Sequence, residues 1–171
     1  MKIVGFDPGT VATGFGIVVF AEGGFRLVSC GVWRPRARLS LAEKLEFLFG
    51  AAEQLLAEAH PDAASIETVF SARNVASSIK LSHARGVLLA AASRSGVPVF
   101  EYQPRLVKKA LVGYGNAEKE QVRAMVLTLL ARQRERVPLD AADALALAIC
   151  HAHACGPLRP ETRVSGPKSQ V

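Results

Sequence analysis

The sequence predicts one α/β domain built on a mixed β-sheet with helices on its faces. Two observations lead to this fold class. The first third of the chain has the alternation and turns of consecutive strands, whereas the rest switches between helical and extended segments. The chain has 171 residues, of which 50% are hydrophobic. That is enough for one hydrophobic core and leaves little room for a second domain.

Three strands are expected before the first helix. Residues 2–7 form an apolar strand and residues 14–20 form a second. The Ala21-Glu22-Gly23-Gly24 turn then leads into a third strand at residues 25–33.

The first helix is marked by its start and by its apolar stripe. Ser40-Leu41-Ala42-Glu43 is a capping-box signature, and His60-Pro61-Asp62 breaks the helix after about residue 59. Helical spacing gathers its apolar residues on one buried face: Leu45, Leu48, Phe49, Ala52, Leu55 and Leu56.

Strands and helices alternate in the remainder of the chain. Gly96 ends an Ala-rich helix, and Pro104 suits the first turn of a later one. The expected elements are a strand at 63–67, a helix at 74–93, a strand at 97–102, and helices at 104–111, from about Asn116, and at 139–154.

The charge and the composition indicate what kind of partner this chain could bind and where it could be located. The net charge of +6 and the pI near 9.6 suit a polyanionic partner, and residues 103–136 hold eight Lys and Arg against three Asp and Glu. No apolar run is long enough to span a bilayer, and Asp7 interrupts the first apolar segment, so we expect a cytoplasmic protein without a secretory signal. Residues 1–155 should form the domain and residues 156–171 a flexible basic tail.

The cysteines and histidines give no sign of a metal or disulfide site. Cys30, Cys150 and Cys155 form no CxxC pair, which favours reduced thiols over zinc ligands. His151 and His153 are two residues apart on an expected helix and face different directions.

Four acids break the hydrophobic pattern where a core is expected. Asp7 and Glu67 each end an apolar strand, and Asp140 and Asp143 are spaced to share one helix face. Three of them have an ordinary alternative: Asp140 could be an N-cap after Pro138, Asp143 could favour the helix dipole, and Asp7 could be a turn residue. Glu67 is harder to explain in this way, because Glu fits strands poorly.

Together the four acids indicate a divalent metal centre. Two carboxylates ~4 Å apart repel by roughly 4 kcal/mol at an effective dielectric constant near 20, so the cluster needs a cation. Mg²⁺ or Mn²⁺ prefers such oxygen ligands, and two ions can clamp a phosphodiester for attack by water. A basic protein with this centre points to nucleic-acid cleavage.

Several blocks, in order and over nearly the whole chain before the tail, resemble the RuvC family of bacterial Holliday-junction resolvases. The blocks are Asp7-Pro8-Gly9-Thr10 with Gly14-Phe15-Gly16, Ile66-Glu67-Thr68-Val69-Phe70, Ala84-Arg85-Gly86-Val87, Val99-Phe100-Glu101-Tyr102, Val107-Lys108, Ala117-Glu118-Lys119 and residues 140–146.

The resemblance implies an RNase H-like fold with a five-stranded mixed sheet flanked by helices. It also implies a homodimer that acts on a four-way DNA junction with the RuvA–RuvB branch-migration complex. Such an enzyme nicks two strands of like polarity symmetrically, leaving 5′-phosphate and 3′-hydroxyl ends, and uses Mg²⁺, two ions per subunit, with Mn²⁺ as a substitute.

Carried over by position, the resemblance assigns roles to residues of this chain. The metal-binding catalytic acids are Asp7, Glu67, Asp140 and Asp143. Lys108 and Lys119 match lysines near the scissile phosphate, and Phe70 matches an aromatic that stacks on junction bases. The other basic DNA-binding candidates are Arg73, Lys80, Arg85, Arg105 and Lys109.

Alternatives to these roles stay open. Phe70 could anchor a loop, and the basic residues could form an ordinary solvated face. The Asp-x-Gly-Thr start also occurs in actin-like and sugar-kinase ATPases, which need two such domains. A simple RNase H, a YqgF-like nuclease and a non-catalytic junction-binding module are the other rivals.

Overall fold

A mixed sheet forms the centre of the molecule. The computed structural model describes all residues except 23, 69–74, 132–136 and 157–171. Within the described residues, five strands pair in the order β3-β2-β1-β4-β5, with β1 antiparallel to β2 and parallel to β4. This arrangement is the RNase H-like mixed sheet that the resemblance implies. The strands are β1 (Lys2–Asp7), β2 (Thr13–Ala21), β3 (Gly24–Trp33), β4 (Ala63–Glu67) and β5 (Val99–Tyr102).

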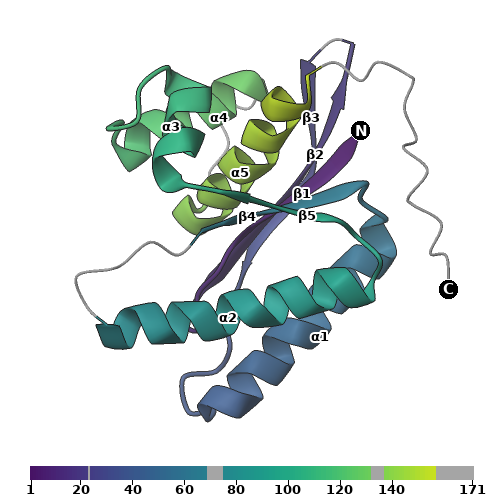
Figure 1. Cartoon of the computed structure of the whole chain (residues 1–171), viewed down its shortest axis with the longest axis vertical. Helices are drawn as coiled ribbons and strands as arrows, with labels where there is room; N and C mark the ends of the chain where they lie inside the picture. The colour runs from purple at the N-terminus through teal and green to yellow at the C-terminus, as the bar shows by residue number, and fades with distance from the viewer. Residues whose placement is uncertain (23, 69–74, 132–136, 157–171) are drawn as a thin grey trace, which may run out of the picture.

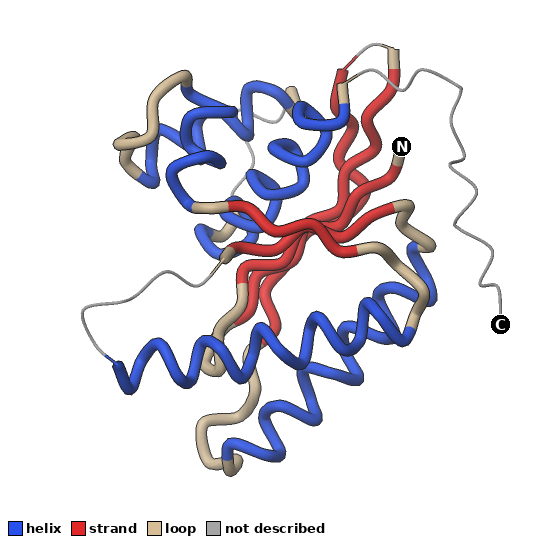
Figure 2. Tube along the Cα trace, in the orientation of Figure 1, coloured by secondary structure: helices blue, strands red, loops and turns tan. Residues whose placement is uncertain are grey.

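Helices cover both faces of this sheet. α1 and α2 lie on one face, and α3, α4 and α5 lie on the other (Figures 1 and 2). Each face has its own hydrophobic core, one around Leu56, Ile66 and Leu88 and the other around Val126 and Leu145. The helices are α1 (Leu41–Ala59), α2 (Val75–Arg94), α3 (Pro104–Val112), α4 (Lys119–Leu129) and α5 (Leu139–Cys155).

Most expected boundaries are confirmed to within one residue, and two differ because of local hydrogen bonds. Ser40 and Glu43 form the expected capping box of α1. β5 begins at Val99 rather than at residue 97, because the N–H of Val97 donates to the carbonyl of Ala92 and closes the end of α2. α4 begins at Lys119 rather than near Asn116, because the Gln121 side chain accepts the N–H of Glu118 at 2.8 Å.

Glycines bring α5 unusually close to the sheet. A Cβ on Gly5 would lie 1.9 Å from the carbonyl oxygen of Ala144, and one on Gly14 would lie 1.9 Å from that of Asp140. Any side chain at these positions would therefore push the helix backbone away. Because Gly14 pairs directly with Asp7 across β1 and β2, this contact sets the first turn of α5 over the end of β1.

Substitution of Gly14 by Ala should destabilise the protein by about 3 kcal/mol, since the added methyl group collides with helix backbone. The matched control is Gly50→Ala in α1, where a Cβ meets nothing within 4 Å. That control should be neutral or stabilising by up to ~1 kcal/mol. Urea denaturation of both variants measures the difference, and equal stabilities would contradict the proposed close contact.

Gly156 caps α5, and nearly all of the predicted tail, residues 157–171, lies outside the described residues. The division of the chain at residue 155 therefore stays a prediction. No helix of the described part is long and apolar enough to cross a bilayer.

Candidate active site

A pocket of about 210 Å³ opens beside the ends of β1 and β4, against α3, α4 and α5. Five charged side chains from these five elements share its lining: Asp7, Glu67, Lys108, Lys119 and Asp143. The remaining lining is mostly apolar: Pro104, Val107, Val122, Ala146 and Leu147. The fold thus brings together three of the four predicted acids and both predicted lysines, which are up to 136 positions apart in the sequence.

Asp7 is the last residue of β1 and carries the strongest electrostatic perturbation of the site. The pKa of Asp7 is raised from 3.8 to about 7, first by burial and then by the nearby Asp143, Glu67 and Asp140, against the opposing effect of Lys119. A carboxyl group that resists ionisation gains most from a bound cation.

Glu67 ends β4 next to Asp7. Burial raises the pKa of Glu67, and Asp143 adds to this effect, whereas Lys119 and Lys108 oppose it. The strand ladder continues one residue beyond it, because the N–H of Thr68 donates to the carbonyl of Tyr102 at 2.9 Å.

The two acids of α5 have different surroundings. The N-cap of α5 is Pro138, so the alternative of Asp140 as N-cap is wrong. Asp140 lies in the first turn, where a carboxylate suits the helix dipole, and Asp143 lies one turn further on. Asp143 lines the pocket, whereas Asp140 lies beside it and forms an ion pair with Arg34 at 3.6 Å.

Lys119 is bonded to one of the acids. Its Nζ donates to Oδ2 of Asp143 at 2.7 Å, and this hydrogen bond raises the pKa of Lys119. The ammonium group therefore neutralises part of the acidic cluster in the absence of a metal ion.

The donor set has the chemistry of a divalent-cation site. Within the described part of the chain, no three His, Cys, Asp or Glu side chains are already grouped to hold a metal ion. Arg34 pairs with Asp140, and Lys119 pairs with Asp143. Carboxylate oxygens are the ligands that Mg²⁺ and Mn²⁺ prefer, and mutual repulsion of the acids favours a cation among them.

The other predicted DNA-binding residues have different surroundings. Arg105 and Lys109 are exposed on α3, and Lys80 is exposed on α2. Arg85 is engaged within the chain, because it bonds to the main chain of Glu67 and to the carboxylate of Glu101. Phe70 and Arg73 lie outside the described residues.

Arg34 is the site neighbour that sequence reasoning missed. It follows Trp33, whose ring stacks on Phe15 at 4.7 Å and whose backbone pairs with Thr13. The strand register thus carries Arg34 to the start of α5. The sequence contains a cation directly after an expected strand, but its acidic partner is visible only once that register is known.

Comparisons with known proteins agree over most of the chain. The model of the family described as crossover junction endodeoxyribonuclease RuvC matches residues 3–151. The protein of that name from Pelotomaculum thermopropionicum is 45% identical over 153 residues, which cover 90% of this chain and 93% of the relative. The structure of Thermus thermophilus RuvC matches with a TM-score of 0.81 at 34% identity, over 88% of this chain and 93% of that one. T. thermophilus RuvC in complex with a Holliday junction substrate matches with a TM-score of 0.82 at 34% identity, over 88% and 92%.

Proposed function

This chain belongs to the RuvC family of crossover junction endodeoxyribonucleases, and on that premise we propose how its residues cut a junction. It is a Holliday-junction resolvase, a metal-dependent nuclease of DNA recombination and repair. We assign phosphodiester hydrolysis to the pocket between β1, β4 and α5. The observation that supports this assignment is the convergence of three acids and two lysines from five separate elements on one small pocket.

The four acids hold the metal in this proposal. Asp7, Glu67, Asp140 and Asp143 bind two Mg²⁺ ions per subunit, with Mn²⁺ as a substitute. When bound, such ions supply Lewis-acid stabilisation on the attacking and the leaving side of the phosphodiester. The raised pKa values of Asp7 and Glu67 support this role, because burial and the neighbouring carboxylates disfavour both anions unless a cation lies close by.

The lysines act on the phosphate. Lys119 pairs with Asp143 at 2.7 Å. If Asp143 held a cation instead, this ammonium group would be available to the scissile phosphate. Lys108 lines the same pocket from α3 and adds a second positive charge. The apolar wall formed by Val107, Val122 and Leu147 limits water around these groups, which strengthens their electrostatic effect.

DNA binding is assigned to the basic surface around the pocket. Arg105 and Lys109 on α3 contact backbone phosphates beside the cut, and Lys80 contacts them further away. Phe70 stacks on a junction base, which is worth roughly 1–3 kcal/mol, and Arg73 binds DNA next to it. These two assignments come from the sequence resemblance alone.

The proposed assembly follows from the symmetry of the substrate. Symmetric nicks on two strands of like polarity need two active centres, and the described part of each chain supplies one such pocket. We therefore assign a homodimer. From the family resemblance we also assign RuvA–RuvB as its partner, the cytoplasm as its location, and 5′-phosphate and 3′-hydroxyl ends as its products.

Cleavage of a labelled synthetic four-way junction, beside a linear duplex of the same sequence, tests the proposed mechanism. Paired, ligatable nicks on the junction alone, in Mg²⁺ and not in EDTA, are the expected result. Binding without nicking in Mg²⁺ would indicate a junction-binding module, and equal cutting of the duplex would indicate a general nuclease.

Metal binding should depend on pH through Asp7. Because the pKa of Asp7 is raised to about 7, its proton must leave before the carboxylate binds a cation. The apparent affinity for Mn²⁺ should therefore rise by up to about tenfold per pH unit below pH 7 and level off above it. Titration calorimetry from pH 5.5 to 8.5, without DNA, measures this. An affinity that is constant between pH 6 and 8 would contradict the assignment.

A further inference from the structure

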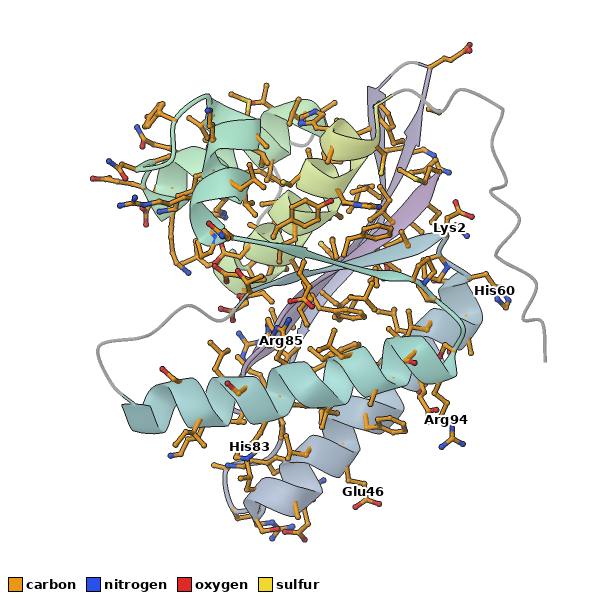
Figure 3. All side chains as sticks on the ribbon, viewed as in Figure 1. Lys2, Glu46, His60, His83, Arg85 and Arg94 are labelled. Carbon is orange, nitrogen blue, oxygen red and sulfur yellow. The ribbon has the colours of Figure 1, made fainter. Side chains whose placement is uncertain are left out.

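Arg85 is partly buried and is paired with groups of its own chain. It belongs to α2, and its side chain is only 19% exposed. Nε donates to the main-chain oxygen of Glu67 at 3.1 Å, and the guanidinium group forms an ion pair with Glu101. Figure 3 shows Arg85 between α2 and the strands, whereas Arg94 of the same helix lies beside α1.

Arg85 approaches Glu67 from the far face of the sheet. In the parallel ladder of β4 and β5, Ile66 pairs with Glu101 and Glu67 pairs with Tyr102. Side chains of paired residues share one face and alternate along a strand. Ile66 packs in the core under α2, so Glu101 and Arg85 lie on that face and the Glu67 side chain lies on the opposite one, in the pocket.

The hydrogen bond of Arg85 therefore holds the main chain of Glu67 without touching its carboxylate. Glu67 is the last residue of β4, and the ladder beyond it consists of Thr68 bonded to Tyr102. A fixed carbonyl at this position fixes the last peptide of the strand and with it the direction of the Glu67 side chain. Charge-assisted donors such as this guanidinium are among the stronger hydrogen bonds in proteins.

We propose that Arg85, held by Glu101, is a positioning residue that aims Glu67 into the metal site from the other side of the sheet. This inference relies on the proposed function, because it takes Glu67 as a metal ligand. It replaces the DNA-binding role that the sequence suggested for Arg85.

Arg85→Met should weaken Mn²⁺ binding to the protein, measured by calorimetry without DNA, by about tenfold, as for other groups that orient metal ligands. It should lower kcat at saturating metal while the KM for the junction stays the same. Arg85→Lys keeps a charge for Glu101 but loses the planar pair of donors, so it should restore only part of the metal affinity. Glu101→Gln keeps the bond of Arg85 to Glu67 and should have a smaller effect.

Arg94→Met is the matched control. Arg94 is on the same helix and forms an ion pair with Glu53 at 3.0 Å, far from the pocket lining. Its loss should shift the melting temperature slightly and leave metal affinity and kcat unchanged.

Two results would overturn the proposal. One is an Arg85→Met variant that loses only thermal stability, as Arg94→Met does, and the other is one that loses junction affinity with normal metal binding. The Glu67→Gln variant tests the metal assignment of Glu67 separately from the positioning role of Arg85. If this variant loses Mn²⁺ affinity and Arg85→Met does not, the positioning role is wrong and the metal assignment holds. If Glu67→Gln binds Mn²⁺ normally, both are wrong.

Discussion

Replacement of Asp7 by Asn is expected to abolish junction cleavage and, at the same time, to stabilise the metal-free protein. The loss of a metal ligand beside the scissile phosphate should cost about 4 kcal/mol of transition-state stabilisation, or roughly a thousandfold in rate. Junction binding should persist, because Asn leaves the basic residues of α3 in place.

The gain in stability follows from the direction of the pKa shift. The pKa of Asp7 is about 7 in the folded protein against an ordinary value of 3.8, so the folded state binds this proton more tightly than the unfolded state. The free energy of unfolding therefore falls as pH rises between about 4 and 7, and the full penalty applies above pH 7. Asn removes this penalty, which should add about 2 kcal/mol at pH 8 after allowance for solvent screening, and little at pH 4.

Three measurements check the Asp7→Asn variant: cleavage in Mg²⁺, a gel shift in Ca²⁺, and urea denaturation in EDTA at pH 4 and 8. Glu46→Gln is the control, because Glu46 is exposed on α1 and Figure 3 shows its side chain pointing away from the sheet. It should cleave normally with unchanged stability. An active Asp7→Asn variant, or an inactive one with lower stability at pH 8, would contradict the proposed role of Asp7.

Most of the fold could be predicted because its signals are local. The capping box at Ser40, the apolar strands at residues 2–7 and 63–67, and Pro104 at the start of α3 each determine an element within a few residues. The differences arise where a contact with a neighbouring segment decides the boundary. Val97, for example, has the composition of a strand residue but bonds to the end of α2.

The acids of the site could be found for a related reason. A carboxylate at the end of an apolar strand violates the hydrophobic pattern, and this violation is visible in the sequence. The sequence does not show in the same way which groups the arginine side chains contact. Arg34 looks like an ordinary surface charge and Arg85 like a DNA-binding residue. Only the strand register and the packing of α2 show that they contact Asp140 and the main chain of Glu67.

The role of Gly14 and Gly16 could be predicted only in part from the sequence. Gly14 and Gly16 could be read as part of a family motif, but their physical role depends on α5. Only the packed structure shows that they let the helix approach until the backbone of Asp140 meets β2. The position of the α5 acids over Asp7 is therefore a property of the whole fold rather than of the local sequence.

Replacement of Lys119 by Ala is expected to lower the cleavage rate by about a hundredfold, with an effect on stability opposite to that of Asp7→Asn. Lys119 supplies the ammonium group that pairs with Asp143 at 2.7 Å, and this bond raises its pKa. Since that stabilisation is lost only when pH rises above the ordinary value of 10.5, it is fully present at neutral pH. Its removal should cost ~1 kcal/mol in the metal-free protein, because the lysine is largely exposed.

Metal binding separates the role of Lys119 from that of the acids. In the metal-free protein its ammonium group competes with a cation for Asp143, so Lys119→Ala should bind Mn²⁺ at least as tightly as the unmodified chain while cleaving far more slowly. Lys109→Ala, which removes an exposed lysine of α3 outside the pocket lining, should cleave at a near-normal rate at saturating junction.

Calorimetry in Mn²⁺ and single-turnover cleavage of both variants provide the comparison. If Lys119→Ala bound Mn²⁺ more weakly, the lysine would be supporting the metal ligands rather than competing for one of them. Unchanged cleavage would remove it from the reaction.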